Sequence, residues 1–264
     1  MEQMNPIILV SNDDGYAAKG IDSLLYFLAP VAEEFGAKII VMAPDGPRSG
    51  NSSAITHDGP VTLRRLANHP TGAEMNAVGG TPVDCVKLGL HLLRERNLKP
   101  SLIVSGINHG SNSAVSVTYS GTMGCAIEGA MNGIPSVGFS LLDYMPDADF
   151  SGCRATVEEI TRKVLGGKLP DRICLNVNIP ANCIPEGIKI ARGARGYWTE
   201  EYKGYTDPHG RPFYWLTGRF HDLEPECEET DEYWLKRRWA TVVPVAADMD
   251  VDTAVAETVR QMLL

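Results

Sequence analysis

Along the first 45 residues the hydrophobic pattern changes from an unbroken apolar run to a helical repeat and back to an apolar run. An unbroken apolar run at residues 7–10 is typical of a strand buried on both faces. Residues 20–35 instead carry apolar side chains every three or four positions and stop before Gly36, which is typical of an amphipathic helix. A second apolar run at residues 37–43 ends at Pro44. The pattern predicts strand, helix and strand with a right-handed crossover, so the two strands should be parallel.

The rest of the chain continues this alternation. Short strands at residues 61–63 and 75–78 are predicted to form a hairpin. A helix start is predicted at residues 81–84, where Thr81 is the N-cap and Pro82 takes the first helical position. Asp84, at the third helical position, would complete a capping box with Thr81. Further elements are predicted at residues 102–104, 125–131, 134–140, 153–165, 174–180, 241–245 and 252–264. The predicted fold class is α/β, a Rossmann-like three-layer fold with a mainly parallel sheet and a C-terminal β-hairpin excursion.

The strand at residues 174–180 closes the predicted core. Its alternation predicts that Leu175, Val177 and Ile179 form the buried face. Residues 1–187 are accordingly predicted to form an α/β catalytic core.

The composition changes at residues 188–240. This segment is rich in acidic residues and gathers eleven aromatic side chains around a turn at residues 208–210. Large rings on an extended hairpin suit either a protein interface or a lid that stacks on a base. An interface is favoured, because an excursion of this length cannot build its own core. Residues 241–264 are predicted to return to the core as a strand and a C-terminal helix.

Charge and cysteine usage limit the function. The 264-residue chain has a formal net charge of −9, which disfavours a nucleic-acid polymer as partner. No apolar run approaches the roughly 20 residues needed to span a membrane, and the start lacks a secretory signal. The six cysteines are scattered without zinc-finger spacing. We therefore expect a cytoplasmic protein with reduced thiols and no membrane partner.

Polar residues follow three of the predicted strands. The first strand leads into Ser11-Asn12-Asp13-Asp14-Gly15, the second into a loop with Arg48 and Ser49, and a later one into Asn108. The ends of parallel strands meet at one sheet edge, so these side chains should lie close together. Carboxylate, hydroxyl and amide oxygens favour Mg²⁺, Mn²⁺ or Ca²⁺. An Asx-type turn is the local alternative for the first loop, which also lacks the G-x-G-x-x-G of dinucleotide sites.

A small-residue helix begins after Ser120-Gly121-Thr122. Hydroxyls and free N–H groups at the positive end of a helix form an anion-binding site, and phosphate is the expected ligand. Simple capping by Ser120 or Thr122 is the alternative, and taken alone it is the stronger one.

Together these motifs resemble the SurE survival-protein family of metal-dependent nucleotidases. Their order and spacing match that family across the N-terminal two-thirds of the chain, while the C-terminal third resembles it only loosely. The matching segments are residues 11–15, 43–45 with 48–50, 80–86, 105–110 and 120–129.

The resemblance implies a function and a set of site residues. It implies a phosphoric monoester hydrolase that converts nucleoside 5′-monophosphates to nucleoside and phosphate, and leaves open 3′-nucleotides and short polyphosphates. Asp13, Asp14, Ser49 and Asn108 would bind one divalent ion per subunit. That ion would be Mg²⁺ or Mn²⁺, and Ca²⁺ could take its place in crystals. Asn12 and the Ser120-Gly121-Thr122 segment would lie near the phosphate. A homodimer or homotetramer formed through the C-terminal hairpin is also implied.

Asp13 and Asp14 are thus the predicted catalytic pair. One of them would take a proton from the attacking water, and the sequence leaves open which. An aspartyl-phosphate route is disfavoured, because adjacent residues at a strand end point apart. A phosphohistidine route through His109 lacks the arginine-rich surroundings that it needs. The non-enzymatic alternative is a nucleotide sensor that binds without turnover.

Overall fold

A nine-stranded, mostly parallel sheet runs through the chain, in the order β3-β4-β2-β1-β5-β6-β7-β13-β8. The computed structural model describes residues 5–250 and 253–263. The strands of this sheet are β1 (Ile7–Ser11), β2 (Lys38–Pro44), β3 (Thr62–Arg65), β4 (Glu74–Gly79), β5 (Leu102–His109), β6 (Ser136–Leu141), β7 (Ile173–Ile179), β8 (Ile188–Ile190) and β13 (Ala240–Ala246). The helices are α1 (Lys19–Phe35), α2 (Pro82–Glu95), α3 (Gly121–Met131), α4 (Arg154–Gly166), α5 (Asp231–Leu235) and α6 (Thr253–Leu263), with 3₁₀ turns η1 (Ala114–Tyr119) and η2 (Ser151–Cys153).

The sheet changes winding direction at β1. The chain passes from β1 to β2 on one side and later returns to β5 on the other, and both pairs are parallel. Ligand sites of such sheets lie at this switch point, outside the carboxyl ends of the strands. The predicted α/β class and the parallel β1–β2 pair are confirmed, and β3 and β4 form the predicted antiparallel hairpin.

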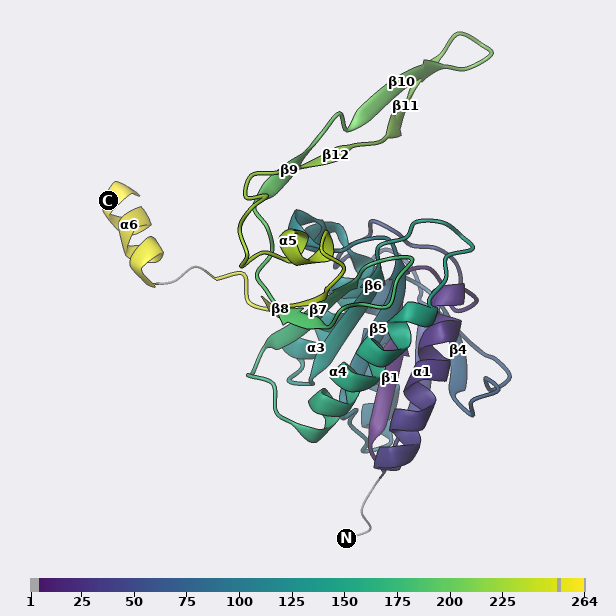
Figure 1. Cartoon of the computed structure of the whole chain (residues 1–264). Helices are drawn as coiled ribbons and strands as arrows, with labels where there is room; N and C mark the ends of the chain where they lie inside the picture. Colours follow the sequence, from purple (N-terminus) through teal and green to yellow (C-terminus); the bar gives the residue numbers. More distant parts are fainter. Residues whose placement is uncertain (1–4, 251–252, 264) are drawn as a thin grey trace.

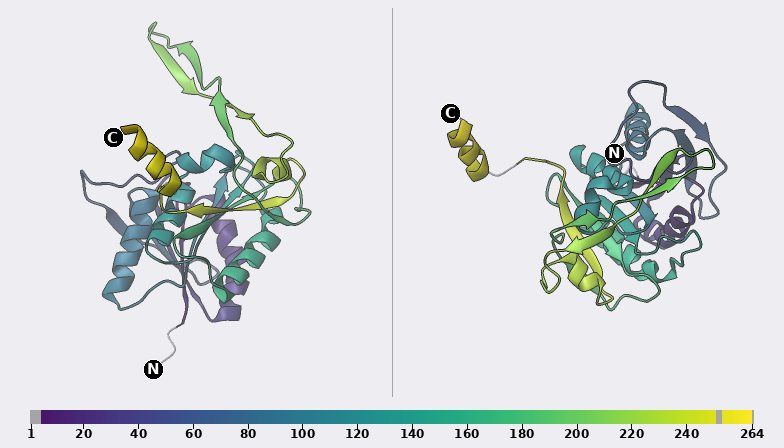
Figure 2. Two further views of the ribbon diagram at one scale, coloured as in Figure 1. Left: turned by 90° about the vertical axis from the view of Figure 1, so that its left-hand side faces the viewer. Right: turned by 90° about the horizontal axis from the view of Figure 1, so that it is seen from above.

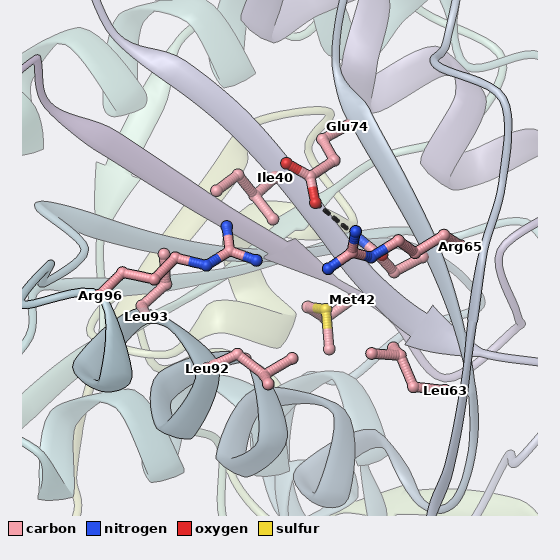
Figure 3. A pocket seen from close by; sticks show the side chains of 10 residues that line it. Ile40, Met42, Leu63, Arg65, Glu74, Leu92, Leu93 and Arg96 are labelled. Carbon is pink, nitrogen blue, oxygen red and sulfur yellow. Dashed lines mark hydrogen bonds between the residues drawn. The ribbon is translucent and has the colours of Figure 1, made fainter.

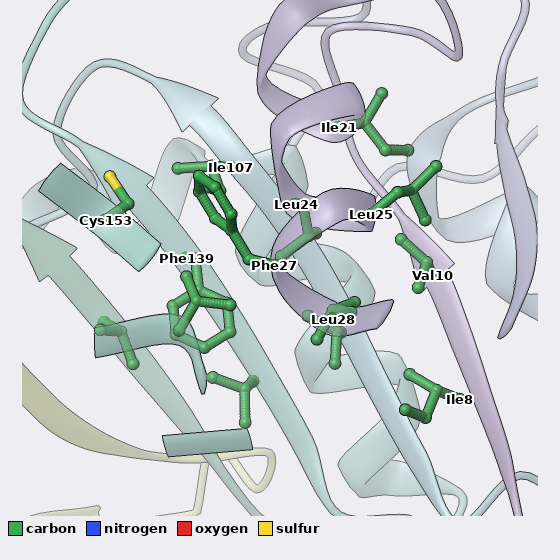
Figure 4. Packing of buried hydrophobic residues seen from close by; sticks show 14 of the residues in the cluster. Ile8, Val10, Ile21, Leu24, Leu25, Phe27, Leu28, Ile107, Phe139 and Cys153 are labelled. Carbon is green, nitrogen blue, oxygen red and sulfur yellow. The ribbon is translucent and has the colours of Figure 1, made fainter. Parts of the chain in front are cut away.

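Two helical layers enclose the sheet. Helices α1 and α4 pack together on one face, and α2 packs with α3 on the other (Figures 1 and 2). On the first face, Ile8 and Val10 of β1 meet Leu24 and Leu28 of α1, and Phe139 of β6 lies in the same cluster (Figure 4). These side chains are almost completely buried, so the core fixes the point at which β1 emerges at the sheet edge.

Helix ends follow the signals in the sequence. Helix α1 stops at Gly36, whose φ of 61° places it in the left-handed region that glycine adopts without cost. At the start of α2, Thr81 accepts a hydrogen bond from the backbone of Asp84, whose side chain accepts one from the backbone of Thr81. The predicted capping box is confirmed.

Strand β7 differs from its predicted pattern. Val177 and Ile179 are buried as predicted, but Leu175 is only partly buried, and the alternating Asn176 and Asn178 are buried as well. The strand lies between β6 and β13, with α3 against one face and the cluster that includes α4 against the other, so its alternation does not separate core from solvent. The two asparagines form a buried polar layer that the sequence analysis did not anticipate.

The C-terminal excursion is a long hairpin that projects from the core (Figures 1 and 2). Strands β9 (Gly196–Thr199) and β12 (Arg219–Asp222) form its base, and β10 (Tyr202–Thr206) and β11 (Pro212–Leu216) form its outer part. We call this unit the arm. Several of its aromatic residues are exposed, namely Tyr197, Tyr202, Tyr205, Phe213, Tyr214 and Trp215.

After the arm, only part of the predicted return to the core occurs. Strand β13 pairs antiparallel with β7 inside the main sheet. Helix α6 has no buried residue and stands apart from the sheet in all three views (Figures 1 and 2). Residues 251, 252 and 264 of the predicted segment, and residues 1–4 at the start, lie outside the described residues. No helix in the described ranges is long and apolar enough to cross a membrane.

Candidate metal centre

The loop after β1 is built as a turn that presents two carboxylates. Asn12 is fully buried, and its side chain donates to the carbonyl of Gly15 (2.9 Å) and accepts from the Gly15 N–H (3.2 Å). The Asx-type turn and the carboxylate site therefore coexist, because Asn12 forms the turn while Asp13 and Asp14 remain available.

Asp13 is a nearly buried carboxylate, with 3% of its surface exposed. Its Oδ1 accepts a hydrogen bond from the Thr122 hydroxyl at 2.6 Å, and Oδ2 accepts none from the described residues. Burial raises the pKa of Asp13 from 3.8 to about 6; the Thr122 hydrogen bond opposes this shift, and the neighbouring charge of Asp14 adds to it.

Asp14 connects the β1 loop to the end of β5. Its Oδ2 accepts the backbone N–H of His109 at 3.2 Å. Burial raises the pKa of Asp14, and the hydrogen bond from His109 opposes that shift. The His109 ring itself packs edge-on against Phe150, with its Nδ1 3.0 Å from the carbonyl of Met145.

The second loop reaches the same edge through its backbone. The N–H of Arg48 donates to the carbonyl of Asp13 at 2.7 Å, which places Ser49 next to a residue in direct contact with the β1 loop. The Arg48 guanidinium bonds Asp45 and the carbonyl of Gly80. Ser49 is exposed, and its hydroxyl forms no hydrogen bond within the described residues.

Asn108, near the end of β5, completes the predicted donor set. It is 9% exposed, and its side-chain Nδ2 donates to the carbonyl of Gly110 at 2.9 Å. This bond fixes the orientation of the amide. The opposite atom, Oδ1, is left without a hydrogen bond from any described residue and can serve as an oxygen ligand.

The start of α3 packs directly against Asp13. A Cβ added to Gly121 would lie 2.8 Å from Cβ and 3.0 Å from Oδ2 of Asp13. Ser120 is the N-cap, and its hydroxyl accepts the Met123 N–H at 3.0 Å. The capping interpretation of Ser120 thus holds, and the Thr122 hydroxyl is used by Asp13. The N–H of Gly121 has no hydrogen-bond partner in the described residues and remains available to an anion.

These residues fit a divalent cation of the hard type. Asp13 Oδ2, Asp14 Oδ1, Ser49 Oγ and Asn108 Oδ1 accept no hydrogen bond from the described residues. No described lysine or arginine forms an ion pair with Asp13 or Asp14. Two adjacent, largely desolvated carboxylates without a counter-charge are costly unless a cation binds there.

The donor set is neither a histidine nor a cysteine site. Across residues 5–250 and 253–263 no cluster of three or more His, Cys, Asp or Glu side chains could hold a metal ion. The set combines two carboxylates with neutral oxygens, which suits Mg²⁺ or Mn²⁺ better than softer ions.

A separate cavity lies between the sheet and α2 (Figure 3). Its floor is aliphatic, with Ile40, Met42 and Leu63, and Arg65 and Arg96 extend over it from opposite sides. With a volume of about 20 Å³ it has room for a single water and is too small for a nucleotide.

The protein-family profile described as Survival protein SurE matches residues 8–200. The chain belongs to the SurE family. That match spans β1, all three strand-end loops and the start of α3, so the resemblance inferred from the motifs is confirmed.

SurE proteins with names and structures resemble this chain over nearly its whole length. The 5′-nucleotidase SurE of Bacteroides fragilis is 46% identical over 249 residues, which cover 94% of each chain. The 5′-nucleotidase SurE of Flavobacterium psychrophilum is 43% identical over 254 residues, 95% of each chain. The crystal structure of the SurE protein from Aquifex aeolicus superposes with a TM-score of 0.81 at 33% identity, covering 97% of this chain and 99% of that one.

The sequence analysis did not identify two contacts in this candidate site. Thr122 donates its hydroxyl to Asp13, and Gly121 allows α3 to approach that carboxylate. The glycine was a visible signal, because a helix start that lacks a side chain permits close approach. Which side chain it would approach depends on how α3 packs on β1, and the local pattern does not contain that information.

Gly121→Ala tests this approach. The added methyl group would displace Asp13, so we expect Mn²⁺ affinity to fall by about tenfold or more, the range of core overpacking. Isothermal titration with Mn²⁺ measures the effect. Gly59→Ala is the matched control, because a Cβ there meets no atom within 4 Å. Wild-type Mn²⁺ affinity in the folded Gly121→Ala protein would contradict the packing argument.

Proposed function

We propose that this SurE protein hydrolyses nucleoside 5′-monophosphates to nucleoside and phosphate, using one divalent metal ion per subunit. The observation that carries the proposal is the desolvated Asp13–Asp14 pair, which has free oxygens and lies against the start of α3. The activity is the one in the names of the Bacteroides and Flavobacterium relatives. The reaction is that of a phosphoric monoester hydrolase.

Asp13, Asp14, Ser49 and Asn108 would hold Mg²⁺ or Mn²⁺. When bound, the ion supplies positive charge for the phosphate oxygens and acidifies water, which the negatively charged chain cannot do by itself. The arrangement in which each donor keeps one unbonded oxygen supports this assignment.

The chain's own residues would bind and orient the phosphate at the start of α3. The free N–H of Gly121 and the positive end of the helix dipole would attract the phosphate. Ser120 and Thr122 would hold this helix start in place through their hydrogen bonds to Met123 and Asp13. Asn12 would act by holding the β1 loop in its turn. Asp14 would be the general base as well as a ligand, because it is less buried than Asp13 and therefore more accessible to the attacking water.

The arm would carry the oligomer. Its outer strands β10 and β11 expose aromatic rings on a projection that extends away from the core, which supports exchange between subunits of a homodimer or homotetramer. In this proposal residues 1–187 are the catalytic core, residues 188–240 the oligomerisation unit, and residues 241–264 the closing segment. Within the second range β8 and α5 pack against β13 of the main sheet, and within the third β13 closes the sheet while α6 stands apart. The six free cysteine thiols fit the reducing cytoplasm as its compartment.

Phosphate release from AMP and GMP tests the function against the sensor alternative. We expect turnover with Mn²⁺ or Mg²⁺, none after chelation, and slower release from 3′-AMP. Colorimetric phosphate detection with purified protein is sufficient, and re-addition of Mn²⁺ after chelation controls for irreversible loss. Tight, metal-dependent AMP binding without any phosphate release would instead identify a sensor.

A further inference from the structure

A short buried segment joins the two halves of the proposed site. Residues 111–114 connect the end of β5, which carries Asn108, to η1 and thereby to Ser120 at the start of α3. Asn112, Ser113 and Ala114 are at most 7% exposed. The position of this segment therefore sets how far the anion-binding helix start lies from the proposed metal ligands.

Asn112 is held by the polar layer of β6 and β7. Its backbone N–H donates to Asn178 Oδ1, its carbonyl accepts from Asn176 Nδ2, and its own side chain donates to Ser140 Oγ, each at 2.8 Å. This explains why β7 carries buried asparagines. They fix one end of the 111–114 segment to the sheet.

Ala114, at the other end, has an unusual backbone. Its φ of 50° lies in the left-handed region, which costs energy for any residue with a Cβ. Its N–H donates to Asp231 Oδ2 at 2.8 Å. A carboxylate on α5 therefore holds Ala114 in a conformation that it would not adopt readily by itself.

Asp231 is itself a costly residue. It is completely buried, and no described lysine or arginine forms an ion pair with it. Backbone groups satisfy it instead, because Oδ1 accepts the N–H of Ala194 at 2.9 Å and of Glu232 at 2.8 Å. A buried carboxylate bonded this way adds little net stability, so its benefit is the geometry that it imposes.

Contacts next to Asp231 also hold the 111–114 segment in place. Glu232 accepts the Ser113 hydroxyl at 2.5 Å, so two consecutive carboxylates of α5 hold two consecutive residues of the segment. Ala194 leads into β9, the first strand of the arm. One carboxylate thus bonds both the segment beside the site and the beginning of the arm.

We propose that Asp231 is a positioning residue for the phosphate reaction, which holds Ala114 so that the start of α3 stands at the correct place beside Asp13. The proposal rests on the proposed function for the identity of the site. Asp231 forms its hydrogen bonds with the backbone of Ala114, Ala194 and Glu232 and would act through residues 111–114. Because it also binds Ala194, a displacement of the arm at its base would reach the phosphate pocket through the same carboxylate.

Asp231→Asn tests the proposal, because the amide keeps the size of the side chain but cannot accept hydrogen bonds at both of its ends. We expect kcat/KM for AMP to fall tenfold or more and inorganic phosphate to bind at least tenfold more weakly in the presence of Mn²⁺. Mn²⁺ affinity should fall by a smaller factor than phosphate affinity, because Asp13 is the one proposed ligand for which a hydrogen bond to α3 is seen among the described residues. Adding Ala114→Gly should restore at least threefold, because glycine adopts the left-handed region without support.

Asp222→Asn is the matched control. Asp222 lies in the arm base, accepts the Glu224 N–H at 2.9 Å and pairs with Lys236 at 2.9 Å, without touching residues 111–114. We expect wild-type activity within twofold. Any of three results would overturn the proposal. They are equal effects of the two variants, a loss of Mn²⁺ affinity in Asp231→Asn as large as its loss of phosphate affinity, and no restoration by Ala114→Gly. Phosphate binding by titration decides the question even if wild-type protein shows no turnover, a result that would refute the proposed function alone.

Discussion

Asp13→Asn is expected to lower kcat for AMP by roughly a thousandfold, the scale on which removal of a central electrostatic group acts. It should also weaken Mn²⁺ binding, because the variant loses the negative charge of the most buried ligand. Asp14→Asn should lower kcat as strongly but weaken Mn²⁺ less, if Asp14 takes the proton. Steady-state kinetics and Mn²⁺ titration on both variants separate the two roles.

Asp22→Asn is the control for these variants. Asp22 lies in the first turn of α1, where its half-exposed carboxylate pairs with His69 at 2.9 Å away from the proposed ligands. Its replacement should leave kcat within twofold of wild type. Wild-type turnover in both Asp13→Asn and Asp14→Asn would exclude the proposed mechanism, and identical changes in all parameters would remove the assignment of separate roles.

Metal-free Asp13→Asn protein is expected to be more stable than metal-free wild type at pH 8, by about 3 kcal/mol. The folded-state pKa of Asp13 is raised from 3.8 to about 6, so between these values the folded protein holds a proton that the unfolded chain has released. Wild-type stability therefore falls as pH rises through this window, and the cost is complete above pH 6. Asparagine has no such proton.

Urea unfolding in chelator at pH 5 and pH 8 measures this difference. The advantage of the variant should be about half as large at pH 5 as at pH 8. Saturating Mn²⁺ should reverse the order, because the cation stabilises only the form with ionised Asp13. A pH-independent difference between the two proteins would show that burial of the Asp13 charge is not its cause.

The candidate donors could be predicted because each follows a strand that the hydrophobic pattern identifies. Asp13 and Asp14, Ser49 and Asn108 sit at or beside the ends of β1, β2 and β5, and parallel topology gathers such ends at one edge. Their roles as ligands remain predictions. The capping box at Thr81 was predictable for a similar reason, because all its contacts lie within three residues.

Contacts between distant segments could not be predicted in this way. The Ser120-Gly121-Thr122 segment was predicted to lie near phosphate, but the hydrogen bond from the Thr122 hydroxyl to Asp13, 109 positions away in the sequence, was not predicted. The alternation of β7 was interpreted as one buried face with Leu175, Val177 and Ile179, because the sequence does not reveal that α3 and Asn112 cover the other face. Nothing in the local sequence distinguishes Asp231 from the many other acidic residues of its segment.

By itself the sequence determined the order of strands and helices, the parallel start of the sheet, the helix caps and the SurE motifs, since each depends on short-range periodicity and local hydrogen bonding. The tertiary structure decided which groups are desolvated and what they touch. Burial of Asp13 against Gly121, the bonds of Asp231 to Ala114 and Ala194, and the separation of α6 from the sheet all depend on packing between distant segments. Desolvation and long-range contact set the energy of a charge, and neither is encoded in any single stretch of the chain.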